Sequence, residues 1–265
     1  MASRLAVTQG NVRFIVELDR YESEKPYYLA GPLNPSDEHR RTNAVFETKA
    51  VQFRDLRGNE NLFSLKSNGF QYMIDEKADA DQLSVLNEDR IKEYAEDTLS
   101  LMRKLFNTES CFISGAATTF IAFPVSRLGI ETSQMNRRHK LTSVNTSPKI
   151  GALYHTLDGG LRRIRRHLSG REQKILLDDP VKNTWRPLNG TVMDYPLAVC
   201  DPTTINISKD ATATDRVSPI YQGENYYLKY RDAHHWYWLS EQRVEELLVF
   251  VSFDSARDMS RSCKI

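Results

Sequence analysis

Aromatic residues are frequent in the last third of the chain, and they constrain the fold class that the chain can adopt. Tyr226–Tyr230 and His235–Leu239 are two short runs of this kind, and they flank the polar segment Arg231–His234. Aromatic residues favour strands, and two such runs separated by a few polar residues are typical of a β-hairpin. A third run, at residues 247–253, is continuously apolar and predicts a fully buried strand. The C-terminal part is therefore predicted to be β-rich.

The rest of the chain supplies further strands and one clear helix. Residues 11–18 and 45–56 predict strands, and the second ends at the turn Arg57-Gly58-Asn59. The helix begins after Asn87, a favoured N-cap, and has apolar residues at three- and four-residue spacings with an acidic first turn and a basic last turn. Leu197–Cys200 predicts a short buried strand. Residues 111–147 mix small, polar and basic residues, so we expect a loop there.

Length and composition predict one soluble, cytoplasmic domain. The 265 residues contain no repeat and no linker-like segment, so we expect a single domain over 1–265, with N-terminal strands and the helix in 1–110 and a β-rich core in 148–255. The net charge is +1 and the mean hydropathy is −0.53, which favours neither nucleic acid nor a membrane as partner. No secretory signal opens the chain, and the three cysteines form no C-x-x-C pair.

His155 and Asp158 are the nearest approach to a metal-binding motif. A non-haem iron site needs two imidazoles and one carboxylate on one side of the ion. Side chains at i and i+3 of a strand point to opposite faces, so His155 and Asp158 would chelate only from a turn or a bulge. A histidine at the surface is the alternative.

Arg186, between Trp185 and Pro187, is the candidate for binding a carboxylate. A guanidinium beside a buried strand can hold a carboxylate with two parallel hydrogen bonds, and an internal ion pair, for example with Asp201, is the alternative. The aromatic side chains nearby are candidates either for a flat ligand pocket or for the core. They are Trp185, Tyr227, Trp236, Tyr237 and Trp238.

Longer strings carry a resemblance to a known family. In the second half these are Asn183-Thr-Trp-Arg-Pro-Leu188, Pro196-Leu-Ala-Val-Cys-Asp201, Gly223-Glu-Asn-Tyr-Tyr-Leu-Lys-Tyr230, His235-Trp-Tyr-Trp-Leu-Ser240 and Glu245-Glu-Leu-Leu-Val-Phe-Val-Ser-Phe-Asp-Ser255. In the first half they include Asp55-Leu-Arg-Gly58 and Asn68-Gly-Phe70. With them the chain resembles the fungal hydroxylase/desaturase family of the AsaB type, which is often labelled cephem methoxylase-like and is similar to a fungal gibberellin desaturase.

The resemblance implies a fold and a chemistry. The implied fold is an α+β, β-rich domain, in which flanking helices surround a double-stranded β-helix, or jelly-roll, core. The implied activity is that of an oxidoreductase of fungal secondary metabolism, with Fe(II) and 2-oxoglutarate as cofactors, that hydroxylates or desaturates a small-molecule intermediate. His155 and Asp158 are then the expected metal ligands, and Arg186, with Trp185 beside it, is the expected carboxylate clamp.

The third metal ligand is the point at which this sequence departs from the family. The family pattern continues beyond the position of Asp254-Ser255 with a Pro-His segment and a Pro-Arg-Glu-Ser stretch. Here Ala256–Ile265 follow, with no histidine among them. We therefore take His235, with its neighbour His234, as the candidate substitute for the missing ligand.

Two other kinds of function stay open. One is a non-catalytic or shortened homologue that acts as a binding subunit for a partner enzyme of the same pathway. The other is a hydrolase without a cofactor, although the chain has no G-x-S-x-G motif. Cys200 lies in an apolar run, which favours an inert buried thiol over a nucleophile.

Overall fold

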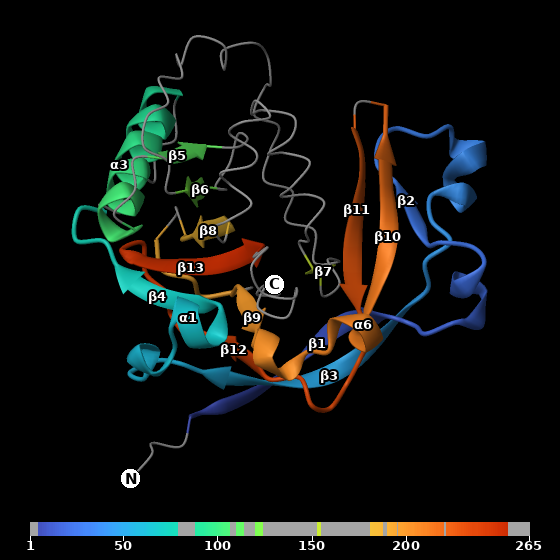
Figure 1. Cartoon of the computed structure of the whole chain (residues 1–265), viewed down its shortest axis with the longest axis horizontal. Helices are drawn as coiled ribbons and strands as arrows, with labels where there is room; N and C mark the ends of the chain where they lie inside the picture. The colour runs from blue at the N-terminus through green and yellow to red at the C-terminus, as the bar shows by residue number, and fades with distance from the viewer. Residues whose placement is uncertain are drawn as a thin grey trace.

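Three β-sheets make up most of the described molecule. The computed structural model describes residues 5–78, 88–106, 110–113, 120–123, 153–154, 181–187, 190–194, 196–219 and 221–253. The sheets, named A, B and C here, have the strand orders β1-β3-β12-β9, β2-β10-β11-β7 and β4-β13-β8-β6-β5. Sheet A forms a floor, and sheets B and C stand as two walls at its ends (Figure 1).

Sheet A joins segments that lie far apart in the sequence. Its strands are β1 (Val7–Ile15), β3 (Phe46–Asp55), β12 (Trp236–Trp238) and β9 (Ala198–Cys200). β1 and β3 form a long antiparallel pair, whereas β12 runs parallel to β3 and antiparallel to β9. Two short 3-10 helices, η1 (Asp19–Glu22) and η2 (Pro35–Arg40), lie between β1 and β3 in the chain.

Sheet B is built on one long hairpin. Its strands are β2 (Tyr27–Leu29), β10 (Ala211–Ser218), β11 (Tyr221–Leu228) and β7 (Leu153–Tyr154). β10 and β11 pair antiparallel along their whole length, β2 adds in parallel to β10, and β7 adds antiparallel to β11. The 3-10 helix η5 (Pro202–Thr204) and the one-turn helix α6 (Ile207–Asp210) lead from β9 into β10.

Sheet C carries the long helix. Its strands are β4 (Phe70–Ile74), β13 (Glu246–Phe253), β8 (Val181–Trp185), β6 (Phe120–Phe123) and β5 (Ser110–Ile113). η3 (Glu60–Leu62) and α1 (Leu65–Asn68) precede β4, and Gly69, with φ of 72°, supplies the left-handed turn between α1 and β4. The helix α3 (Glu88–Phe106) buries Met102 against Leu247 and Val249 of β13.

Both walls meet the same face of sheet A, which we call the inner face. Side chains alternate along a strand, so Phe46 and Arg54 of β3 share this face, and the register places Tyr237 beside Arg54. Tyr237 contacts Phe70 of sheet C, with ring centroids 6.0 Å apart. Phe46 meets Tyr227 of sheet B edge-on, with centroids 4.9 Å apart. The inner face is therefore the one enclosed between the walls.

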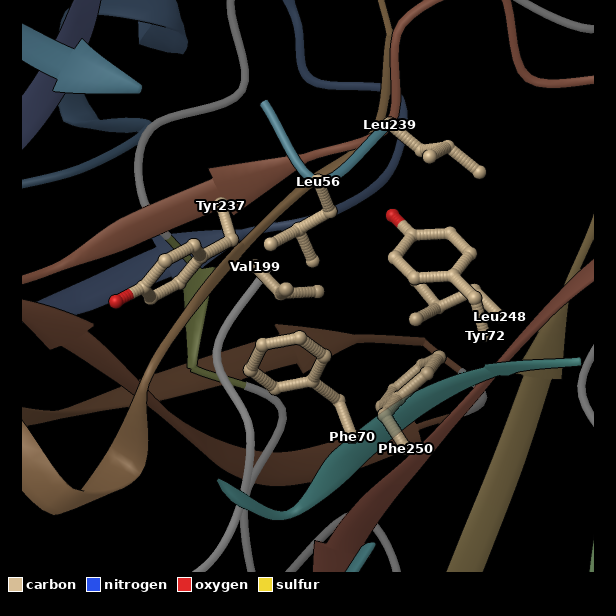
Figure 2. Packing of buried hydrophobic residues seen from close by; sticks show 8 residues of the cluster. All are labelled: Leu56, Phe70, Tyr72, Val199, Tyr237, Leu239, Leu248 and Phe250. Atoms are coloured by element: carbon tan, nitrogen blue, oxygen red, sulfur yellow. The ribbon is translucent and has the colours of Figure 1, made fainter. Parts of the chain in front are cut away.

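A buried cluster joins sheet A to sheet C. Figure 2 shows its side chains converging from both sheets and from the segments beside them; they are Leu56, Phe70, Tyr72, Val199, Tyr237, Leu239, Leu248 and Phe250. A second cluster lies on the opposite face of sheet A and includes Leu228 from the end of β11; its buried members are Phe14, Val51, Cys200, Ile205, Leu228 and Trp236. These clusters hold the three sheets together by apolar burial.

Most strands predicted from the sequence are confirmed, but two predictions are wrong. The two aromatic runs do not form a hairpin, because Tyr226 and Tyr227 pair with β10 and β7 in sheet B whereas Trp236–Trp238 lie in sheet A. Residues 111–113 and 120–123, which we expected to be loop, belong to an antiparallel pair of strands, β5 and β6. The helix after Asn87 is confirmed at 88–106. The predicted loop elsewhere in 111–147 lies outside the described residues.

The fold class is β-rich with few helices, as a jelly-roll-type protein requires. The sheets are mixed rather than purely antiparallel, and closure into a complete barrel is not established by the described strands. Among the described helices, none is long and apolar enough to cross a membrane.

Candidate functional site

Trp185 ends β8 and Arg186 follows it directly, and the two side chains have different surroundings. Trp185 is partly buried and packs against the cluster that joins sheets A and C. Arg186 is 2% exposed, and its Nη2 donates to Oδ2 of Asp75 at 2.6 Å. Asp75 follows directly after β4. The structure thus places Arg186 in an internal ion pair, which was one of its two expected roles. Its role as a carboxylate clamp stays a prediction.

The partner of Arg186 is Asp75 and not Asp201. Asp201 is buried, but its side chain is engaged within its own turn. Its Oδ1 accepts hydrogen bonds from the Thr203 amide at 2.9 Å and from the Thr203 hydroxyl at 2.7 Å, and its Oδ2 accepts one from Asn68 at 3.1 Å. The carboxylate of Asp201 therefore anchors η5 to α1.

Of the three candidate metal ligands, only His235 lies within the described residues. His155 and Asp158 lie outside them. The backbone of His235 bonds to Thr204 Oγ1 and to the amide of Asp201, which fixes the start of β12. No group of three His, Cys, Asp or Glu side chains in the described part of the chain is arranged to hold a metal ion. The described residues alone do not make an iron site.

His234 is more deeply buried than His235 and belongs to a polar network. Its Nε2 lies 3.3 Å from Asp210 Oδ2. The same oxygen accepts the Asn206 amide at 2.8 Å, and Asp210 Oδ1 accepts from Arg231 Nε at 3.1 Å. Both oxygens of Asp210 thus accept hydrogen bonds, and the pair stabilises the segment between β9 and β10. The role of His234 beside His235 as a substitute metal ligand stays a prediction.

The burial of His234 predicts a pH-dependent stability. Burial lowers the pKa of His234 from its ordinary 6.5, aided by the charges of Arg231 and His235, although Asp210 opposes the shift. Between the folded and unfolded pKa values the unfolded chain binds more protons, so the free energy of unfolding falls as the pH drops below about 6.5. Urea titrations from about pH 7.5 to 5 measure this slope. The His234→Gln variant should give a shallower slope, whereas a variant at the exposed His39 should match the parent; equal slopes in all three would refute the assignment.

Cys200 does not provide a nucleophile. Its thiol is fully buried in the cluster with Phe14 and Trp236. Burial raises the pKa of this thiol far above its ordinary value, so it stays protonated at neutral pH. The geometry thus agrees with the inert thiol expected from the sequence and gives no support to a cysteine hydrolase.

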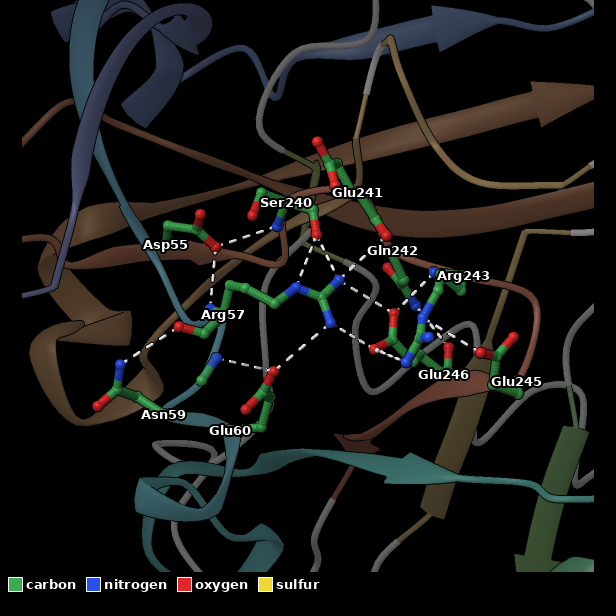
Figure 3. Close-up of polar contacts among 11 residues, drawn as sticks. Asp55, Arg57, Asn59, Glu60, Ser240, Glu241, Gln242, Arg243, Glu245 and Glu246 are labelled. Atoms are coloured by element: carbon green, nitrogen blue, oxygen red, sulfur yellow. Dashed lines mark hydrogen bonds and ion pairs between the residues drawn. The ribbon is translucent and has the colours of Figure 1, made fainter.

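A network around Arg57 and Glu246 was not predicted (Figure 3). Arg57 donates to the Ser240 carbonyl at 3.1 Å, to the Glu241 carbonyl at 3.0 Å and to both oxygens of Glu246. Burial alone would raise the pKa of Glu246, but hydrogen bonds from Arg57 and the Arg243 amide outweigh it and lower that pKa. The network ties the end of β3 to the start of β13. Both residues lie in strings that carry the family resemblance, which was the signal available in the sequence.

The aromatic candidates divide between core and inner face. Trp236 and Tyr237 are buried in the two clusters that hold the sheets together. Tyr227 is only partly buried and lies where sheets A and B meet, beside Phe46. β7 pairs with β11 at Tyr226 and Tyr227 and ends at Tyr154, the residue before His155 in the sequence. The strand that leads to the candidate metal ligands therefore borders this junction.

Sequence comparisons identify related proteins. A family model described as "Oxidoreductase/YMDC permease-like domain" matches residues 13–264. Aspirochlorine biosynthesis protein N of Aspergillus oryzae is 30% identical over 109 residues, which are 38% of this chain and 44% of that protein, so the match spans less than half of that relative. The Fe(II)/2-oxoglutarate-dependent dioxygenase nvfI of Aspergillus novofumigatus is 24% identical over 254 residues, 91% of this chain and 81% of that protein.

Solved structures show the same fold. A structure of the iron and alpha-ketoglutarate-dependent endoperoxidase NvfI matches with a TM-score of 0.75 over 99% of this chain and 89% of that chain. A second structure of that protein gives a TM-score of 0.71 with the same coverage. The sequence identity is 19% in both comparisons, so the likeness establishes the fold and not the activity.

Proposed function

Because the chain belongs to the family described as the oxidoreductase/YMDC permease-like domain, we propose that it is an iron(II)- and 2-oxoglutarate-dependent oxygenase of fungal secondary metabolism. The observation that carries the proposal is its agreement with the dioxygenase nvfI in both sequence and fold along almost the full length of the chain. The implied substrate is a small-molecule intermediate. The strings quoted above favour the AsaB type, whose members hydroxylate or desaturate. Length and composition favour a single cytoplasmic domain.

His155 and Asp158 are the proposed metal ligands, and His235 is the proposed third. Support for His155 and Asp158 comes from the family resemblance and from their position in the sequence, shortly after β7 ends at Tyr154. His235 lies directly before β12. Arg186 and Trp185 are the proposed carboxylate clamp and its neighbour. The described residues do not complete the iron site, so we assign no reaction step to individual side chains.

A non-catalytic homologue is the second candidate. It is favoured by the buried ion pair of Arg186 with Asp75, which occupies the side chain expected to hold a carboxylate. In that case the protein would bind a small molecule, or a partner enzyme of the same pathway, without turnover.

Anaerobic titration of the purified protein with Fe(II) and 2-oxoglutarate tests the proposal. We expect the visible charge-transfer band of the chelated pair to appear. The His155→Ala and Asp158→Asn variants should lose it, because losing one ligand of three weakens metal binding by more than the roughly 10–100-fold cost of an outer contact. The exposed His39→Ala variant is the matched control and should retain the band.

A folded protein without the band would reject the oxygenase proposal and favour the non-catalytic candidate. Circular dichroism of the same samples shows whether the protein is folded. If the band appears and survives in His155→Ala, the oxygenase proposal stands but its ligand assignment is wrong. Loss of the band in His235→Ala would identify the third ligand.

A further inference from the structure

β1 stands at one end of sheet A and has a strand partner on one side only. It pairs with β3 over its nine residues, and no other described strand pairs with it. The register is continuous from Val7 to Ile15, without a bulge. Figure 1 shows the start of β1, in dark blue, at the lower rim of the molecule. A regular edge strand of this kind is a template on which another strand can pair.

Alternate residues of β1 direct their backbone groups toward β3 or away from it. Just before β1 the carbonyl of Ala6 accepts the Asp55 amide at 2.8 Å, and just after it the Val16 amide donates to the Val45 carbonyl at 2.9 Å. An antiparallel strand uses every second residue for its bonds to one neighbour, so the even-numbered residues bond to β3. The odd-numbered residues therefore direct their N–H and C=O groups outward from the sheet.

The first half of β1 is exposed on both faces of the sheet. Val7 is 54% exposed, and Gln9 on the same face is exposed as well. Thr8, on the other face, is also exposed, whereas Phe14 near the end of the strand is buried. We call the exposed segment Val7–Asn11 the β1 edge. Side chains from the rest of the molecule do not shield it, so its outward backbone groups are accessible to a partner.

The β1 edge lacks the features that protect sheet edges from association, which are short strands, prolines, charged side chains and bulges. The other edge strands of sheets A and B follow this rule. β2 and β9 have three residues each and β7 has two, and Pro26 and Pro202 lie beside β2 and β9. The β1 edge reads Val-Thr-Gln-Gly-Asn, with no charge and no proline.

We propose that the β1 edges of two copies of this chain pair antiparallel and form a closed dimer. A two-fold axis at Gln9 places Val7 of one chain opposite Asn11 of the other, so the outward-directed residues meet each other. This register allows about six backbone hydrogen bonds, two at each of three residue pairs. Because no residue of the segment is charged, no like charges meet across the axis. Each copy uses its β1 edge once, so assembly stops at two chains.

The other face of the β1 edge supports the same register. A side chain on Gly10 would bring its Cβ to within 2.9 Å of Phe53 Cε2, so the Phe53 ring lies over this glycine. The two-fold axis at Gln9 places Thr8 of one chain opposite Gly10 of the other, where no side chain obstructs it and the Phe53 ring is beside it. Aromatic and β-branched side chains stabilise each other across paired strands, and a ring that covers an edge glycine has the same effect.

Sedimentation velocity of the full-length protein at increasing concentration tests the proposal. We expect a reversible change from the 30.5 kDa chain to a particle of twice that mass. Gln9→Pro removes an outward N–H and no bond to β3, and it should weaken the dimer by about tenfold or more. Gln9→Ala is the matched control, because it keeps the N–H, and it should dimerise as the parent does.

Charges at position 9 test the register itself. In Gln9→Lys and in Gln9→Glu, like charges face each other across the axis, so each variant alone should dimerise at least about tenfold more weakly at low salt. An equimolar mixture of the two variants should dimerise again, because a lysine then faces a glutamate. Gln9 is exposed, so both variants should fold, and they decide the question if Gln9→Pro does not fold.

Four results would overturn the proposal. These are a parent that stays monomeric at every concentration, equal dimerisation of folded Gln9→Pro and Gln9→Ala, a charge mixture that dimerises no better than its components, and particles that grow beyond two chains. Circular dichroism shows whether each variant is folded. The pairing uses none of the proposed iron ligands, so its outcome is independent of the titration with Fe(II) and 2-oxoglutarate.

Discussion

Replacing Asp75 with asparagine is expected to lower the free energy of unfolding by about 3–5 kcal/mol, which is a large part of the stability of an ordinary domain. The Arg186 side chain is 1% exposed, and its Nη2 lies 2.6 Å from Asp75 Oδ2. The variant leaves the guanidinium buried beside a neutral amide, and a buried charge that loses its counter-charge is costly. Urea unfolding followed by tryptophan fluorescence measures the change.

Two controls make this result specific. The double variant Asp75→Asn with Arg186→Met should be less destabilised than Asp75→Asn alone, because it removes the buried guanidinium together with the carboxylate of Asp75. The variant Glu38→Gln removes only the exposed side of an ion pair with Arg41 and should leave the unfolding midpoint unchanged. If Asp75→Asn lowers the free energy of unfolding by less than about 1 kcal/mol, the ion pair is not a main source of stability. The alternative role of Arg186, binding the carboxylate of a ligand, would then be favoured.

Local patterns predicted the elements well, because each pattern depends on residues that are close in sequence. The strand at 246–253 follows from a continuous apolar run, and the helix at 88–106 follows from its periodicity and its charged ends. Both elements lie within single segments, so no knowledge of distant residues was needed to find them.

Pairing partners could not be predicted in the same way. The runs at 226–230 and 235–239 read as a hairpin, yet the chain between them leaves sheet B and enters sheet A. Lys229 and Arg231, which lie between the two runs, form ion pairs with Glu17, a residue more than 200 positions earlier in the sequence. Arg231 also forms an ion pair with Asp210. A propensity identifies a strand but not the strand that it pairs with.

The candidate site shows the same limit. Arg186 was expected to be either a clamp or half of an ion pair, and the nearby Asp201 was the natural partner by sequence distance. The actual partner, Asp75, lies 111 residues away, and its carboxylate is close only because β4 and β8 both flank β13. The contact between Phe46 of β3 and Tyr227 of β11 likewise joins residues far apart in the sequence, which the sequence alone could not bring together.

The variant Phe70→Ala is expected to destabilise the fold by about 3–5 kcal/mol. Phe70 is fully buried where sheet C meets sheet A, stacked on Phe63 at 5.2 Å and tilted against Tyr237 at 6.0 Å. Removing the ring leaves a cavity lined by groups from both sheets, which cannot close without moving one sheet relative to the other. Thermal and urea unfolding measure the loss.

Phe63→Ala is the matched control, because Phe63 contacts the same cluster but is only partly buried. Its loss should be clearly smaller, and equal losses would contradict the role of Phe70 as the buried link between the sheets.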